Sequence, residues 1–145
     1  MTQEEGKLLL LDLSARLIYG VQINTPRGIF ELDAVSQGII SLKDRDNIFS
    51  DLIKHSDGKY WFHIRTGDYK PYLRPMSSMT EDEKREYGKL LDDCEEQDLA
   101  DYNITTLVDS MLFFVIDWLN EHHFDYRGLI NLGLALEAPK GMYKI

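Results

Sequence analysis

The spacing of hydrophobic residues changes along the chain, and this change limits the possible folds more than any other feature. Residues 2–17 carry leucines at helical spacing, whereas residues 19–42 and 59–65 alternate between apolar and polar side chains. After residue 80 the helical spacing returns. This order predicts an α+β fold: an N-terminal helix, a small antiparallel sheet of about four strands, and a C-terminal cluster of three helices.

Local signals define the first helix and suggest another in the sheet region. Thr2 and Glu5 have the spacing of a capping box, which predicts a helix start. Asp12 and Arg16 are four residues apart, so we expect them to support this helix by about 0.3–0.5 kcal/mol. The apolar residues within 46–55 also have helical spacing, which predicts a short helix there.

Two prolines in residues 70–75 exclude the interior of a helix from this segment. Each proline lacks a backbone donor and favours an extended conformation in the residue before it. We expect a stiff connector, either an edge strand or a polyproline-like segment, between a sheet half (1–75) and a helical half (80–138). Because this linker is short, the whole chain (1–145) is predicted to form a single α+β domain.

The helical half is predicted to hold three helices. The first begins at a capping box (80–83) and extends to about Asp98, and the second covers 105–122. The third is short, begins at Asp125 and ends before 139–141. The second helix is strongly apolar but is interrupted by acids, so we interpret it as a buried core helix and not as a membrane span.

The net charge and the single cysteine limit the function classes. The chain has 25 acidic and 16 basic residues, for a net charge of −9, which argues against coating nucleic acid or anionic membranes by bulk charge. Cys94 is the only cysteine, so no intramolecular disulfide can form and a cytoplasmic location is expected. No motif indicates a cofactor.

The acidity is concentrated in one segment. Residues 81–101 contain ten acids and three bases, and without them the chain has a net charge of only −2. Carboxylates near the end of a helix oppose its dipole, so they need another explanation. One is a binding surface for a basic protein partner, and the other is a solvated, solubilising face. The candidate binding residues here are Asp92, Asp93, Glu95 and Glu96.

A second candidate surface combines aromatic and basic residues over 59–74. Strand alternation places Tyr60, Phe62 and Ile64 on one face of the strand. The side chains of the other face could then bind a peptide or stack on the bases of a nucleic acid. The alternative is a half-buried strand covered by another helix. The candidate binding residues are Trp61, Arg65, Tyr72 and Arg74.

The sequence gives little support to catalysis or metal binding. Cys94 lies among acids, which should raise the pKa of its thiol. His122 and His123 are adjacent and therefore point about 100° apart on a helix, so we predict no metal site. A small metal-dependent enzyme that uses His63, His122, His123 or Asp125 is kept as an alternative.

Three segments carry a family resemblance: KPYLRPMSSMTE (70–81), DWLNEHHFDYRGLI (117–130) and ALEAPKGMY (135–143). The chain resembles a group of small uncharacterised proteins encoded by gut bacteria and their phages or mobile elements. The resemblance implies no known activity and no functional residues. It implies a mobile-element setting, in which genes often encode interaction modules, and an accessory factor of such an element is one expectation.

These observations favour a non-enzymatic protein-interaction module of unknown specificity. The first alternative is a protein related to nucleic acid, acting through the 59–74 surface or by acidic mimicry of DNA. The second is the small metal-dependent enzyme. The oligomeric state is left open, because the apolar stripe of the acidic helix suits either its own domain or a second copy.

Overall fold

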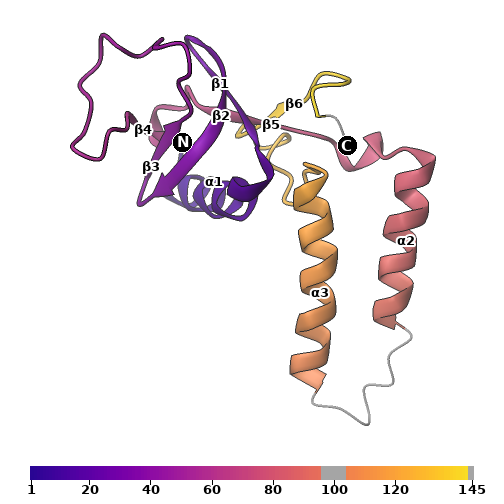
Figure 1. Ribbon diagram of the computed structural model, residues 1–145. Coiled ribbons are helices and arrows are strands. Elements are labelled where there is room, and N and C mark those ends of the chain that lie inside the picture. The colour runs from indigo at the N-terminus through magenta and orange to yellow at the C-terminus, as the bar shows by residue number, and fades with distance from the viewer. Residues whose placement is uncertain (96–103, 144–145) are drawn as a thin grey trace.

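The computed structural model describes residues 1–95 and 104–143, with side chains described for 1–93 and 113–143. The predicted α+β class is confirmed. One helix lies against a sheet, and two further helices run side by side and project away from it (Figure 1). Across the described ranges, no helix is long and apolar enough to cross a membrane.

The helical segments are α1 (Gln3–Arg16), η1 (Leu17–Tyr19), η2 (Ile64–Thr66), η3 (Met76–Ser78), α2 (Glu81–Glu95) and α3 (Ile104–Glu121). α1 and α2 begin where the two capping boxes place them. The capping box of α1 is confirmed: Thr2 Oγ1 accepts a hydrogen bond from the Glu5 N–H (3.1 Å), and the Glu5 carboxylate accepts one from the Thr2 N–H (2.9 Å). The predicted end of α2 near Asp98 lies outside the described residues.

Six strands form one mixed sheet in the order β4-β3-β2-β1-β5-β6. They are β1 (Gln22–Thr25), β2 (Gly28–Ser36), β3 (Ile39–Leu42), β4 (Trp61–His63), β5 (Lys70–Leu73) and β6 (Leu136–Glu137). Neighbouring strands are antiparallel except β5 and β6, which are parallel. The prediction of about four antiparallel strands thus describes β1–β4 but not the whole sheet. The proline-containing connector forms β5, and it has a neighbour on each side.

The segment after Asp125 forms turns and β6 where a helix is predicted, so among the described residues the C-terminal cluster has two helices instead of three. Asp125 still acts as a cap, because its carboxylate accepts hydrogen bonds from the N–H groups of Leu129 and Ile130, both at 2.9 Å. Gly128 and Gly133 have φ of 75° and 74°, a left-handed conformation that interrupts a helix. The chain therefore turns back to the sheet.

The short helix predicted within 46–55 is also wrong, because this segment consists of turns. The Asp44 carboxylate accepts hydrogen bonds from the N–H groups of Ile48 (2.8 Å) and Phe49 (2.9 Å). Phe49 is 2% exposed, and its ring centroid lies 4.8 Å from that of Phe30. One buried aromatic anchor therefore holds this loop, in place of the apolar face of a helix.

The main hydrophobic core lies between α1 and the sheet. α1 contributes Leu9 and Leu13, and the central strands contribute Ile23, Leu32 and Ile40, all of them buried. A second cluster lies at the base of α2 and α3, which we call the helical arm (81–95 and 104–121). Its buried members are Met79, Val115, Trp118, Leu119 and Phe124.

A buried ion pair connects α1 to the segment that follows α3. Arg16 Nε donates to Asp12 Oδ2 at 2.8 Å, and neither side chain is exposed to solvent. Arg16 Nη2 also donates to the carbonyl oxygen of Phe124 at 2.6 Å, and Arg127 Nε donates to Asp12 Oδ1 at 3.2 Å. The pair is therefore a tertiary connector, a role beyond the modest support for one helix that its spacing predicts.

Replacing Arg16 with methionine should lower the free energy of unfolding by about 3 kcal/mol or more, because the buried Asp12 carboxylate loses its main partner. The matched control is Arg27→Met, since the Arg27–Asp51 ion pair is exposed and should contribute little. Urea unfolding of both variants measures the difference. Equal losses in the two variants would contradict the connecting role of Arg16.

Candidate functional site

Arg74 joins the helical arm to the sheet. Its guanidinium donates to both carboxylate oxygens of Glu83 in α2, at 2.8 and 2.7 Å, and lies 4.2 Å from the ring centroid of Phe124. Its backbone N–H donates to the carbonyl oxygen of His123 (2.7 Å), and its carbonyl oxygen accepts from the Asp125 N–H (2.8 Å). Arg74, a candidate binding residue from the sequence, is therefore engaged within the chain.

Glu83 has two roles at the start of α2. Hydrogen bonds from the Arg74 guanidinium, aided by one from the Thr80 backbone, lower the pKa of Glu83 to about 2. Its carboxylate accepts from the Thr80 N–H (3.0 Å), while the Glu83 N–H donates to Thr80 Oγ1 (3.2 Å). The second capping box is therefore formed, and the same carboxylate anchors the arm through Arg74.

The other three aromatic and basic candidates lie in separate places. Trp61 on β4 is half-buried and donates through Nε1 to Asp57 Oδ2 at 2.8 Å. The Tyr72 hydroxyl on β5 donates to Asn24 Oδ1 at 3.2 Å, and β3, β2 and β1 lie between β4 and β5 in the sheet. Arg65 is exposed in η2. The structure therefore does not bring these residues together in one groove.

The alternation predicted for residues 59–65 holds on the inner face. Phe62 and Ile64 point inward and are 8% and 1% exposed. β4 itself is shorter than predicted, because the chain enters η2 at Ile64. On the outer side, Lys59 forms an ion pair with Asp33. This pairing removes one of the free bases on which a nucleic-acid surface would depend.

The helix α3 has apolar side chains on more than one face. A stripe at helical spacing packs at the base of the arm, and its members are Val115, Trp118 and Leu119. His122, which follows the end of α3, is also buried. Off this stripe, Phe113 is 61% exposed, Phe114 is 67% exposed and Ile116 is 37% exposed. The expectation of a buried core helix therefore fails for its outer face. The sequence already indicated this exposure. A segment with apolar residues on every side of the helix cannot be covered by one neighbouring helix.

Carboxylates accompany this apolar surface. Those described as exposed in the last turn of α2 and in α3 are Asp92, Asp93, Asp117 and Glu121. The side chain of Glu95 and the whole of Glu96 lie outside the described residues. The 18 residues of α3 include no lysine or arginine. The described outer face of α3 is therefore apolar and acidic.

The histidines do not form a cluster, because they are either exposed in separate parts of the chain or in contact with other groups of the protein interior. His63 is exposed on β4, whereas Nδ1 of His122 lies 2.8 Å from the carbonyl oxygen of Trp118. Asp125 is occupied as a backbone cap. In the part of the chain that the structure describes, no three His, Cys, Asp or Glu residues are grouped to hold a metal ion.

His123 is buried at the turn after α3. It has a φ of 62°, and its ring stacks on that of Tyr143 with a centroid distance of 3.5 Å. Burial lowers the pKa of His123 to about 4, and the charges of Arg16 and Arg74 act in the same direction. Burial also raises the pKa of Tyr143 to about 12. Both rings are therefore neutral near pH 7.

Lowering the pH from 6.5 to 4 should destabilise the protein through His123. In this window the unfolded chain binds a proton at His123, whereas the folded chain does not, so the free energy of unfolding falls as the pH falls. His123→Asn removes the titration and tolerates positive φ. Urea unfolding across this window should show a smaller pH slope in the variant. The same slope in both proteins would assign the effect to other groups.

The comparisons add no relative from which a role could be transferred. Comparison of the chain with protein-family models, curated proteins and solved structures gives no match.

The candidate site is therefore defined by geometry alone. We call it the arm surface: the exposed apolar side chains of the helical arm together with the exposed carboxylates of the last turn of α2 and of α3. Its described members are Leu91, Asp92, Asp93, Phe113, Phe114, Ile116, Asp117 and Glu121.

Proposed function

We propose that this protein is a non-enzymatic interaction module that binds a protein partner through the arm surface. The observation that carries the proposal is the exposure of two adjacent aromatic side chains, Phe113 (61%) and Phe114 (67%). They lie on a helix that projects from the sheet (Figure 1). A partner can therefore approach the arm without contacting the rest of the molecule.

Covering these side chains would release substantial free energy. Full burial of one phenylalanine side chain stabilises a complex by about 1.5–3 kcal/mol, and large aromatic side chains are enriched in protein interfaces. Leu91 and Ile116, each 37% exposed, add apolar area on the same arm. Exposed apolar surface of this kind, rimmed by polar residues, is typical of interaction sites.

The charge of the arm indicates the chemistry of the partner. Residues 81–101 contain ten acids and three bases, and α3 adds acids without any base. Complementary charge accelerates association and excludes acidic competitors. A basic amphipathic helix, with apolar side chains for the phenylalanines and lysines or arginines for the rim, fits this surface.

The alternatives have less support. Direct binding to nucleic acid would use the bases of residues 59–74, but Lys59 is paired with Asp33 and Arg74 with Glu83. Acidic mimicry of DNA would use the carboxylates of the arm but would not require its phenylalanines. A role as an accessory factor of a mobile element accords with an interaction module and rests only on the family resemblance.

The test is affinity capture with two variants and their matched controls. Phe113→Ser/Phe114→Ser should abolish capture of the specific partner, whereas Ile53→Ser should not, since Ile53 is 91% exposed but lies in a distant loop. Asp92→Lys/Asp93→Lys should weaken capture about tenfold or more through charge reversal. Its control places the same type of reversal on α1, as Glu4→Lys.

Three outcomes would contradict the proposal, and a fourth would contradict its charged rim. A partner captured equally by the phenylalanine variant and the wild type does not bind the arm surface. Capture that depends on the carboxylates alone, and that DNA competes away, indicates mimicry. Sedimentation equilibrium that shows a dimer lost on Phe113→Ser/Phe114→Ser would assign the surface to self-association. Binding that persists at high salt would argue against the charged rim.

A further inference from the structure

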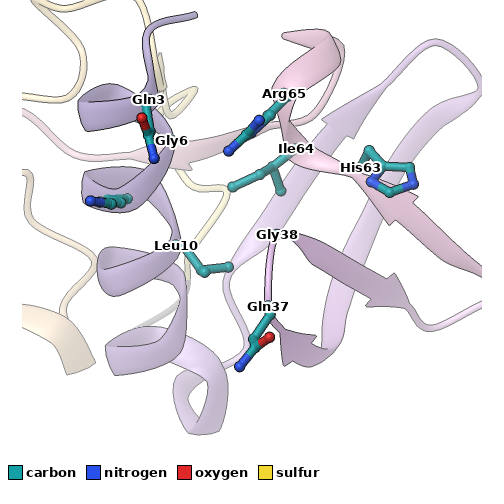
Figure 2. Close-up of a pocket in the computed structure, with 9 residues that line it drawn as sticks. Gln3, Gly6, Leu10, Gln37, Gly38, His63, Ile64 and Arg65 are labelled. Atoms are coloured by element: carbon teal, nitrogen blue, oxygen red, sulfur yellow. The ribbon is translucent and has the colours of Figure 1, made fainter.

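A separate pocket lies on the opposite part of the molecule, between α1, the β2–β3 turn and η2. Its volume is about 430 Å³, within the range of small-molecule sites. Leu10 and Ile64 form apolar walls, and Figure 2 shows Arg65 reaching from η2 toward Gln3 and Gly6 on α1. The pocket is open to solvent on one side, so a ligand can enter without a rearrangement of the core.

Gly6 leaves space in the wall that α1 forms. A Cβ atom at this position would come no closer than 3.8 Å to another atom, that atom being Met1 Sδ, so packing within the chain does not require glycine here. Glycine also destabilises a helix relative to alanine. Gly6 also lines the pocket, where it leaves α1 without a side chain.

The polar rim of the pocket is positively charged. Lys7 and Arg65 line it, both are exposed, and no acidic residue among those described lines it. Neither base forms an ion pair within the described residues. In a chain with 25 acids and 16 bases, a pocket with two bases and no acid departs from the general charge. Gln3 and Gln37 add neutral hydrogen-bonding groups at the mouth.

We propose that this pocket binds a small amphipathic anion, a fatty-acid-like molecule whose carboxylate meets Lys7 and Arg65 and whose apolar chain lies against Leu10 and Ile64. The apolar walls would exclude water from the chain, and the arginine fork would hold the carboxylate by charge-assisted hydrogen bonds. The His63 ring lies on the far side of the pocket from α1 and is not needed for this contact (Figure 2). The proposal does not depend on the arm surface.

Isothermal titration calorimetry with decanoate tests the site. We expect decanoate to bind with one-to-one stoichiometry, and decyltrimethylammonium, with an equal chain and a positive head, to bind at least about tenfold more weakly. Lys7→Gln/Arg65→Gln should weaken decanoate binding by about tenfold or more. The control Lys84→Gln/Arg85→Gln removes the same charge from the exposed face of α2 and should have no effect.

A second variant tests the space rather than the charge. Gly6→Leu would fill the pocket and should abolish binding, whereas Gly6→Ala should retain most of it. If Gly6→Leu does not fold, the charge variants, which change exposed side chains, still decide the question. Phe113→Ser/Phe114→Ser should leave decanoate binding unchanged, so the two proposals can fail separately. Equal affinity for both head groups, or insensitivity to the Lys7 and Arg65 changes, would overturn the assignment.

Discussion

The buried ion pair between Asp12 and Arg16 is the interaction on which the rest of the arrangement depends. A charge in the core must be paired and hydrogen bonded, because it has lost its hydration. Arg16 donates through Nε to the Asp12 carboxylate and through Nη2 to the carbonyl oxygen of Phe124, which is 108 positions away in the sequence. Its Nη1 has no partner among the described residues. The buried ion pair of α1 therefore gains its remaining hydrogen bonds only when the segment after α3 is in place. Arg127, in that segment, donates a hydrogen bond to the other carboxylate oxygen of Asp12.

The same segment also receives Arg74 from the sheet, so two arginines meet at Phe124. Arg16 bonds its carbonyl oxygen, and Arg74 covers its ring while holding Glu83 at the start of α2. The helical arm is thus anchored at its base, where Trp118 is buried. Within the described residues, its outer face has no covering element, and this is the physical reason that large aromatic side chains remain in contact with water there.

Short-range signals predicted much of this fold, and their failures have a common cause. The capping box at Thr2 acts between neighbours in sequence, so it can be found without the tertiary structure. The prediction failed within 46–55, where Phe49 is a single buried anchor, and after Asp125, where a correct cap leads into turns. Helical spacing cannot show whether the apolar residues of a short segment share one face in the folded protein.

The sequence by itself determined the α+β class, the helix starts and the concentration of acid in residues 81–101, because these depend on local composition and spacing. Only the tertiary structure decided which charged side chains form ion pairs within the chain and which are exposed without one. It placed Arg74 inside the framework and left Arg65 exposed beside α1, although both look alike as bases beside a strand. The reason is that burial and ion pairing depend on segments far apart in sequence, and no local pattern records them.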